Sequence, residues 1–292
     1  MYELVQISEK CYYINCPAKI GVYVADKDNA YLVDSGNDKD AGRKAKQILD
    51  RNGWHLTAIL NTHSNADHIG GNKYLQGQTG CKIYSGGIEA AFTKYPVLEP
   101  SFLYGGYPCK DLRHKFLMAQ ESSVTDFSDE SFPRELEVIP LPGHFFNMVG
   151  FGMPDGVVFL ADCISSRETL EKYAVPFIYD VGAYLETLVM VEGMQASMFV
   201  PAHAKASADI KELVCCNRDK VLDVAERILS VCEEPACFEH ILQKLFQGYG
   251  LSMNFEQYAL VGSTVRSYLS WLKDSEKLAA VFQDSMLLWQ RA

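Results

Sequence analysis

Histidine and carboxylate side chains recur at four places along the chain, each directly after a short apolar run. His63, Asp67 and His68 stand close together, and three single residues follow much later in the sequence. Imidazole and carboxylate groups are ligands that suit zinc, iron and manganese. A metal held by three protein ligands keeps an open position, where bound water becomes acidic enough to supply hydroxide near neutral pH. The sequence therefore predicts a hydrolytic metal centre, whose candidate ligands are His63, Asp67, His68, His144, Asp162 and His203.

The elements around these residues favour a mixed α/β fold. Apolar runs bounded by polar residues, proline or glycine predict strands, and runs of helix formers ended by glycine predict helices. The expected strands are 2–7, 11–15, 21–25, 30–33, 56–60, 81–84, 136–141, 148–152, 157–160 and 198–200, and the expected helices are 40–52, one starting at 72, 87–94 and 181–195. Because α/β folds place reactive groups at strand ends, we expect the strands of one sheet to deliver the histidines and aspartates to one edge.

The segment after residue 204 has a different pattern, which is mostly helical. Helices are expected at 209–231, 237–247, 254–258 and 262–273, and a strand pair at 278–282 and 286–289. Helices followed by a hairpin indicate a winged-helix-like layout. We therefore predict two domains, a metal-binding domain over residues 1–205 and a small C-terminal winged-helix-like domain over residues 206–292.

Four motifs make the chain resemble the metallo-β-lactamase superfamily, including its glyoxalase II-like hydrolases. The family pattern His-x-His-x-Asp-His is followed by Pro-Gly-His, by an aspartate ending a strand, and by a final histidine. The matching stretches are Thr62 to Gly71, Leu141 to His144, Phe159 to Asp162 and Val200 to His203, preceded by Leu32 to Gly36. The resemblance covers about residues 1–205 and implies an αββα sandwich, with two sheets between helices.

The resemblance also implies roles for these residues. One metal site would use His63, Asn65 and His144, and a second would use Asp67, His68 and His203. Asp162 would bridge the two metals. The implied catalyst is a hydroxide held between them, with Asp67 or this hydroxide handling protons and Asp162 holding the metals together.

Asn65 departs from the family pattern, because it stands where the family has its second histidine. An amide oxygen is a weaker and harder ligand than imidazole, so the first site should lose zinc affinity or accept an oxygen-preferring metal. Three outcomes stay open: a binuclear centre with Asn65 as a weak ligand, a single metal, or a partly degenerate site. We expect one or two divalent ions, with zinc favoured over iron or manganese.

Two other functions compete with hydrolysis. Iron-dependent persulfide dioxygenases resemble this scaffold and hold one iron with residues that match His63, His144 and Asp162. A non-catalytic, metal-poor member would follow from the loss of the second histidine at Asn65. Retention of Asp67, His68 and His203 favours the hydrolase, acting on a small, anionic ester or thioester.

The segment from 93 to 132 is rich in aromatic residues and proline and shows no clear periodicity. It fits either a lid over the metal cleft or a satellite hydrophobic cluster under a loop. Its basic run, Arg113 to Lys115, fits either an anion contact or a solvated surface. The expected substrate contacts are Tyr104, Arg113 and Phe145.

Composition limits the partners and the compartment. The 27 Lys and Arg against 37 Asp and Glu give a net charge of −10, and residues 205–292 give 10 − 12 = −2, which disfavours nucleic acid. Apolar runs fall short of the roughly 20 residues of a membrane-spanning helix, and no export signal is expected. Nine cysteines without CxxC spacing indicate reduced thiols in a cytoplasmic protein. A homodimer is compatible with the C-terminal segment.

Overall fold

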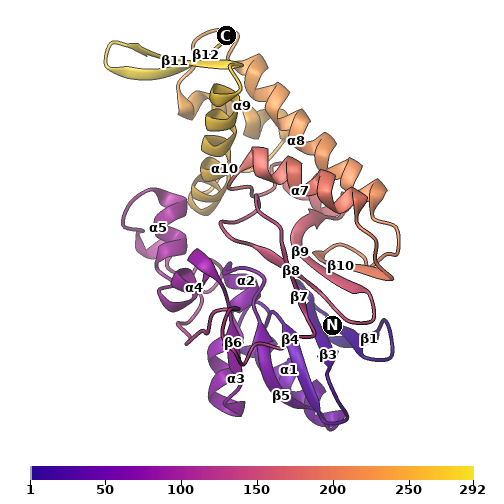
Figure 1. Cartoon of the computed structure of the whole chain (residues 1–292). Helices are drawn as coiled ribbons and strands as arrows, with labels where there is room; N and C mark the ends of the chain where they lie inside the picture. Colours follow the sequence, from indigo (N-terminus) through magenta and orange to yellow (C-terminus); the bar gives the residue numbers. More distant parts are fainter. Residues whose placement is uncertain (1) are drawn as a thin grey trace.

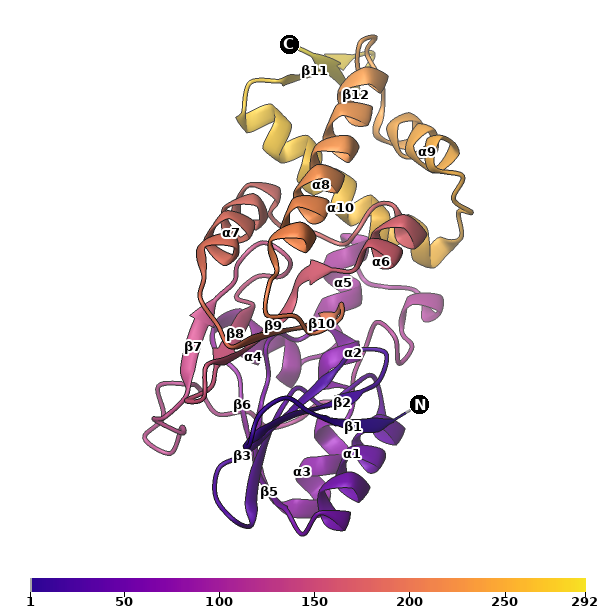
Figure 2. The same cartoon turned by 90° about the vertical axis from the view of Figure 1, so that its right-hand side faces the viewer.

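Two β-sheets lie face to face between two layers of helices, as Figures 1 and 2 show from perpendicular directions. The computed structural model describes residues 2–292. The first sheet has the strand order β1-β2-β3-β4-β5-β6 and the second has the order β10-β9-β8-β7. This arrangement confirms the expected αββα sandwich.

The first sheet begins as an antiparallel meander and continues as parallel strands. Parallel neighbours need crossover connections, which helices α1 (Lys39–Arg51) and α3 (Asn72–Thr79) supply. The side chain of Asp38 accepts from the Ala41 backbone N–H and caps the start of α1. The strands are β1 (Glu3–Gln6), β2 (Cys11–Asn15), β3 (Ile20–Val24), β4 (Asn29–Val33), β5 (His55–Leu60) and β6 (Lys82–Tyr84).

The second sheet is antiparallel from β7 (Glu137–Pro140) through β8 (Val149–Gly152) to β9 (Val157–Ser165). Its last strand, β10 (Met198–His203), pairs parallel with β9. The connection between β9 and β10 contains α6 (Arg167–Tyr173) and α7 (Val181–Gly193), and α7 packs against β9. The sequence analysis missed α6, which is only seven residues long.

Apolar side chains fill the space between the layers. Val33 and Leu60 of the first sheet meet Phe151 and Phe159 of the second in one buried cluster. A separate cluster lies between the first sheet and helices α1 and α3. Because both sheets are covered on both faces, their strands consist largely of buried residues, which explains the short apolar runs in the sequence.

The segment from 93 to 132 is more regular than its sequence predicts. It contains α5 (Leu98–Tyr104) and a short 3-10 helix (Lys110–Leu112), next to α4 (Gly87–Lys94). Phe102 packs on Phe145 and Phe146 at ring-centroid distances of 6.1 and 5.1 Å. Leu103, Leu112 and Leu117 form a small cluster with Ala259, partly covered by Phe102, Phe177 and Leu260. The segment is thus largely held by apolar packing, and its role as a lid stays a prediction.

The C-terminal segment contains α8 (Lys211–Val231), α9 (Phe238–Tyr249), α10 (Phe255–Asp274) and the hairpin of β11 (Leu278–Gln283) and β12 (Met286–Arg291). The expected helices at 254–258 and 262–273 are one helix, because Leu260 and Val261 continue its apolar face without a break. These helices share one hydrophobic cluster with α7 and the second sheet. The domain boundary at residue 205 and the winged-helix interpretation stay predictions.

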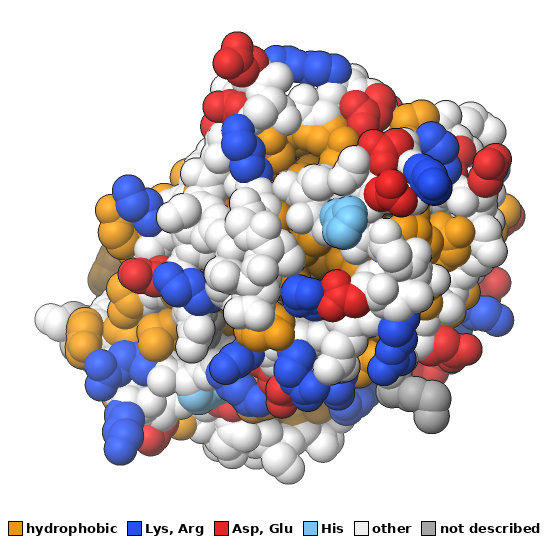
Figure 3. Space-filling view, turned by 90° about the horizontal axis from the view of Figure 1, so that it is seen from below, with side chains coloured by type: hydrophobic (Ala, Val, Ile, Leu, Met, Phe, Trp, Pro, Cys, Tyr) orange, Lys and Arg blue, Asp and Glu red, His pale blue; other side chains and the backbone are white. Residues whose placement is uncertain are grey.

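On the face shown in Figure 3, lysine and arginine side chains predominate across the lower half, and aspartate and glutamate side chains are more frequent in the upper part. The expectation that nucleic acid is not a partner stays a prediction. Within residues 2–292, no helix is both long and apolar enough to span a membrane.

Candidate metal centre

The first group of candidate ligands lies in the loop and the single helical turn that follow β5. The turn is α2 (Ala66–Ile69), which the sequence analysis did not predict. The Ser35 backbone N–H donates to the carbonyl of His68 at 2.8 Å, and the Ser35 hydroxyl donates to the same carbonyl at 3.1 Å. The loop after β4 thereby fixes α2, which presents Asp67 and His68 to the space between the sheets.

Gly70 and Gly71 follow α2, at a point where the chain passes very close to backbone atoms of neighbouring segments. A Cβ atom on Gly71 would lie 2.4 Å from the Ser35 carbonyl oxygen and 3.0 Å from Gly42 Cα. Both neighbours are backbone atoms, so neither can move without shifting α1 or the loop after β4. The paired glycines of the motif are therefore needed for the close approach of α2, α1 and that loop.

Replacing Gly71 with alanine is expected to destabilise the protein by about 1–3 kcal/mol, because the new methyl group overlaps backbone. Gly77 in α3 provides a matched control, since nothing lies within 4 Å of its added Cβ. Gly77→Ala should be neutral or stabilising by up to about 1 kcal/mol, as alanine is the better helix former. Urea unfolding of both variants measures the difference. Equal free energies of unfolding for the two variants would show that the close backbone contacts at Gly71 do not disfavour a methyl group there.

The other ligands come from the second sheet, so the expectation that the strands of one sheet deliver all of them to one edge is wrong. His144 follows β7 after Gly143, whose φ of 119° and close contact with the Tyr184 backbone exclude a larger residue. His203 is the last residue of β10. Asp162 requires a correction, because it lies inside β9 and not at a strand end. Ala161 has a φ of 50° and the pairing with β10 shifts register there, so a local bulge places Asp162 at the site.

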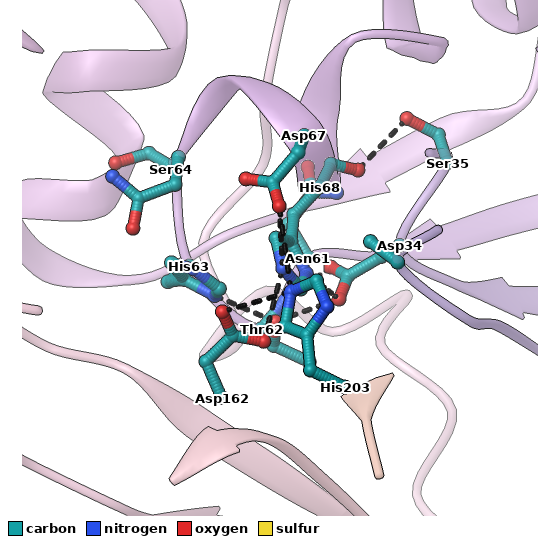
Figure 4. A network of polar contacts seen from close by, with 12 residues as sticks. Asp34, Ser35, Asn61, Thr62, His63, Ser64, Asp67, His68, Asp162 and His203 are labelled. Carbon is teal, nitrogen blue, oxygen red and sulfur yellow. Dashed lines mark hydrogen bonds and ion pairs between the residues drawn. The ribbon is translucent and has the colours of Figure 1, made fainter. Parts of the chain in front are cut away.

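These residues converge in two groups that share Asp162. Figure 4 shows His63, Asp67, His68 and His203 around this aspartate. The first group is His63, His144 and Asp162, and the second is Asp67, His68, Asp162 and His203, with potential ligand atoms within 4.8 Å of one another in each. Asp162 Oδ2 lies 3.6 Å from His144 Nε2 and 3.2 Å from His203 Nε2. Asp67 Oδ2 lies 3.4 Å from His203 Nε2 and 3.7 Å from His68 Nε2. The expected bridging position of Asp162 is compatible with this geometry.

Asp34 orients two of the histidines. Its Oδ2 accepts from His68 Nδ1 at 2.8 Å and from the Thr62 hydroxyl at 2.7 Å, and its Oδ1 accepts from the Thr62 backbone N–H. The Thr62 oxygen lies 3.0 Å from His63 Nδ1. Since its hydroxyl proton is given to Asp34, the Thr62 oxygen accepts from His63. One buried carboxylate thus directs Nε2 of both His63 and His68 at the site, where each can bind a metal.

Two observations show that the cluster fits a divalent metal. First, His63 Nε2, His68 Nε2 and Asp162 Oδ1 are buried and have no hydrogen-bond partner among the described residues. His68 Nε2 and Asp162 Oδ1 are 3.1 Å apart, but they lack hydrogen-bond alignment. Second, His203 Nδ1 donates to the Pro17 carbonyl at 3.1 Å, which directs its Nε2 toward the site as a potential ligand. Buried imidazole nitrogen atoms around a carboxylate are the donors that zinc requires.

Asn65 also faces the first group. Its Oδ1 lies 3.2 Å from His144 Nε2, and its Nδ2 donates to Glu99 Oε1 at 2.8 Å. Glu99 is buried in α5 at 5% exposure, and burial raises its pKa well above the usual value. Because Glu99 accepts from the amide nitrogen, the amide oxygen turns toward the metal position. Asn65 as a ligand, through this oxygen, stays a prediction.

A second buried glutamate, Glu89 in α4, ties the two ligand loops together. It accepts from the backbone N–H and hydroxyl of Ser64 and from the backbone N–H of Asn147 at 2.7 Å. Burial raises the pKa of Glu89 to about 7, and these donors oppose the rise. The sequence analysis missed both Glu89 and Glu99. The available signal was a lone carboxylate in each of two short, largely apolar helical segments.

The expected substrate contacts lie in three different environments. A cavity of about 610 Å³ opens over Asp67, His144, Asp162 and His203, and neither Tyr104 nor Arg113 is among its lining residues. Tyr104 packs near Phe255, with ring centroids 5.9 Å apart, and Arg113 donates to the Tyr107 hydroxyl. Phe145 is fully buried behind His63, where it contacts aromatic rings. These positions favour packing for Phe145 and surface roles for the other two.

The metal-free cluster holds protons that a metal must displace. Burial by itself lowers the pKa of His203, but Asp162 and Asp67 overcome this and raise it to about 10. Burial likewise opposes the charge on His68, yet Asp162, Asp67 and Asp34 raise its pKa well above the usual value. Without a bound metal, both imidazoles therefore favour the positively charged form, with a proton on each ring nitrogen.

Zinc affinity is accordingly expected to rise between pH 6 and 8, by up to about tenfold per pH unit for each displaced proton. The sign follows from the raised pKa values, because each proton is bound below the pKa and must leave when the nitrogen binds metal. Competition with a chromophoric chelator, corrected for protonation of the chelator, measures the slope. An affinity independent of pH would contradict the protonated resting state.

Comparison with protein families identifies the same region. Residues 16–203 match the family model described as "Metallo-beta-lactamase superfamily". The match includes all the candidate ligands, from His63 to His203, and covers more than half of the chain.

Curated relatives match shorter stretches. A hydroxyacylglutathione hydrolase from Rhodopseudomonas palustris is 42% identical over 77 residues, which cover 23% of this chain and 29% of that protein. A protein of the same name from Maricaulis maris is 28% identical over 116 residues, covering 39% and 36%. The chain thus matches only about a third of the length of these two relatives.

Solved structures resemble nearly the whole chain. A beta-lactamase domain protein from Burkholderia ambifaria has a TM-score of 0.73 at 17% identity, covering 99% of this chain and 94% of its own. A metallo-beta-lactamase family protein from Thermus thermophilus has a TM-score of 0.71 at 16% identity, covering 100% and 98%. At these identities the likeness concerns the fold, which includes the C-terminal helices.

Proposed function

Because this chain belongs to the metallo-beta-lactamase superfamily, we propose that it is a metal-dependent hydrolase of a small ester or thioester. One observation carries the proposal: two groups of ligand atoms share Asp162, and each contains a buried imidazole nitrogen without a partner among the described residues, His63 Nε2 in one and His68 Nε2 in the other. A group of buried imidazoles around a carboxylate, oriented by a second carboxylate at Asp34, is arranged for metal binding. The hydroxyacylglutathione hydrolase relatives support a thioester as one candidate substrate.

The first group would hold one metal through His63 and His144, with Asn65 contributing its amide oxygen. The second would hold another through Asp67, His68 and His203, and Asp162 would serve both. When bound, the metals supply a hydroxide nucleophile near neutral pH and polarise the substrate carbonyl. We propose zinc, since imidazole predominates, while the oxygen of Asn65 also admits manganese or iron.

The two aspartates can serve as permanent negative charges in the site. Burial raises the pKa of Asp67 and Asp162, but His68 and His203 beside them hold both values below the usual range. Asp67 is the more exposed of the two and lines the cavity, so its carboxylate can accept a hydrogen bond from an incoming water molecule. Asp162, at 11% side-chain exposure, lies beside the Nε2 atoms of His203 and His144, at 3.2 and 3.6 Å. A cytoplasmic location and a homodimer stay predictions.

Metal content per chain, measured by elemental analysis of protein purified without chelator, tests the proposal. About two zinc, manganese or iron ions per chain, together with hydrolysis of a panel of esters and thioesters, would support a binuclear hydrolase. One iron per chain with oxygen uptake would favour the dioxygenase, which needs only His63, His144 and Asp162. Absence of metal after reconstitution would favour the metal-poor alternative.

The variant His144→Ala is expected to lose at least one metal per chain and to reduce hydrolysis by about 100-fold or more, an order-of-magnitude expectation for loss of a metal ligand. His55→Ala is the matched control, since His55 is an exposed histidine at the opposite end of β5 from the ligand loop. Unchanged metal content in His144→Ala would remove this residue from the site. Circular dichroism checks that both variants are folded.

A further inference from the structure

The cavity over the metal-binding residues has an apolar wall built from three separate parts of the chain. Phe116 comes from the segment between α5 and β7, and Val175, Pro176 and Phe177 come from the segment between α6 and α7. Leu260 and Val261 come from α10. The C-terminal helix therefore completes the cavity, which is not formed by the sandwich alone.

This wall is held in place by packing. Leu260 and Phe177 contact the cluster of Leu103, Leu112, Leu117 and Ala259, and Val261 is 3% exposed. Phe177 also lies against His144, with ring centroids 5.4 Å apart and an interplanar angle of 82°. An apolar group that enters the cavity would thus reach from the ligand histidine to α10 along a continuous surface.

Few charges face the cavity apart from the candidate metal ligands. Among the described lining residues, these are Lys172 and Glu168, which have opposite signs and belong to the same short helix, α6. Lys172 Nζ donates to the Tyr173 hydroxyl at 3.1 Å and lies over that ring. Both lysine and glutamate side chains are exposed. The wall therefore offers no paired cations for a substrate with several carboxylates.

The basic run that the sequence analysis associated with an anion is directed elsewhere. Lys115 Nζ donates to Asp38 Oδ2 at 3.0 Å, and His114 Nε2 lies 3.7 Å from Glu256 Oε2. The guanidinium group of Arg113 lies over the Tyr107 ring at 5.3 Å. Each of the three basic side chains already has a partner outside the cavity lining.

We propose that this site is specific for esters or thioesters whose acyl group is apolar and uncharged, and that α10 determines this specificity. The inference rests on the proposed hydrolase function and narrows its substrate class, since a small anionic substrate was expected from the sequence. A cavity of about 610 Å³ accommodates a medium-length acyl chain beside the metal-binding residues. Each methylene group buried against the wall should increase kcat/KM about threefold to fourfold, until the cavity is filled.

The test compares p-nitrophenyl esters of acetate, butyrate, hexanoate and octanoate with the p-nitrophenyl monoester of adipate, using the full-length protein as purified with its metal. Adipate matches hexanoate in carbon number but ends in a carboxylate. We expect kcat/KM to rise from acetate to hexanoate and to be at least about tenfold lower for adipate than for hexanoate, because the charge would be buried in an apolar cavity. Equal values for these two esters would overturn the proposal.

Leu260→Lys should weaken or abolish the preference, because it introduces a cation into the wall. The ratio of hexanoate to adipate hydrolysis should fall by about tenfold or more. Leu222→Lys, at an exposed position of α8, introduces the same charge outside the cavity and should leave the ratio unchanged. If Leu260→Lys does not fold, Phe177→Leu provides a second variant, which should weaken the dependence on chain length. The wall would have no role in specificity if both variants left two quantities unchanged. These are the ratio of hexanoate to adipate hydrolysis and the dependence of kcat/KM on acyl chain length.

Binding measurements separate this inference from the proposed hydrolase function. Isothermal titration compares octanoate with suberate, which has the same number of carbons and a second carboxylate. Tighter binding of octanoate would support the apolar cavity even if no ester were hydrolysed, in which case only the hydrolase function would fail. The opposite result would be hydrolysis that does not distinguish hexanoate from adipate esters, together with equal binding of octanoate and suberate. It would contradict the proposed apolar substrate class but would leave the hydrolase function in place.

Discussion

Replacing Asp34 with alanine is expected to lower metal affinity by about 10- to 100-fold, although Asp34 touches no metal position itself. The substitution removes the acceptor for His68 Nδ1, for the Thr62 hydroxyl and for the Thr62 backbone N–H. Without this acceptor the two imidazoles lose their fixed tautomer and orientation. Zinc affinity, measured by chelator competition, reports the loss for both metal positions.

The same substitution should reduce the free energy of unfolding by about 3–5 kcal/mol, since three buried donors lose their partner. Asp34→Asn keeps the shape and one acceptor oxygen, but its NH2 group faces donors, so it should lie between wild type and alanine. Asp40→Ala in the first turn of α1 is the control, because that carboxylate is exposed and forms only a surface ion pair with Arg43. An Asp34→Ala protein with unchanged zinc affinity would show that the histidines are oriented without it.

The substitution Asn65→His is expected to have the opposite effect and to tighten zinc binding at the first site by about tenfold or more, since imidazole is a better zinc ligand than an amide oxygen. Glu99 is already positioned behind residue 65, where it accepts from the Asn65 amide nitrogen at 2.8 Å. It can accept from the second ring nitrogen of a histidine and so complete a carboxylate–histidine–zinc arrangement.

The double variant Asn65→His/Glu99→Gln isolates this contribution, because it keeps the new ligand and replaces its buried carboxylate partner. We expect part of the gain in affinity to be lost in the double variant. Elemental analysis and chelator competition at the first and second sites are the measurements. Equal zinc affinity before and after Asn65→His would mean that residue 65 does not face the metal, against the 3.2 Å distance between Asn65 Oδ1 and His144 Nε2.

Several features of the site have a clear origin in the sequence. The ligand residues and their order could be recognised because each stands at or shortly after an apolar run, and strand and turn propensities act over a few residues. Gly70 and Gly71 also belong to the local motif. For this reason most of the strands and helices were predicted with nearly correct boundaries, whereas the αββα arrangement of two sheets was expected from the family resemblance.

The partners of these ligands could not be predicted from the sequence. Asp34 orients His68 from 34 positions away, and Glu99 holds Asn65 across the same separation. The bulge that places Asp162 inside β9 depends on the register of β10, which is a pairing between distant segments. Such contacts depend on how the layers pack, and no local pattern in the sequence records them.

The amino-acid sequence thus contained the ligand types and their order along the chain, which follow from short-range patterns, and the motifs whose family resemblance implied the fold. It did not reveal the character of the substrate cavity. The basic run of Arg113 to Lys115 suggested an anion, yet its side chains contact Tyr107, Asp38 and Glu256, while Leu260 and Val261 of α10 complete the wall. Helix α10 follows His203 by more than 50 residues, so only tertiary packing determines that it lies over the candidate metal centre.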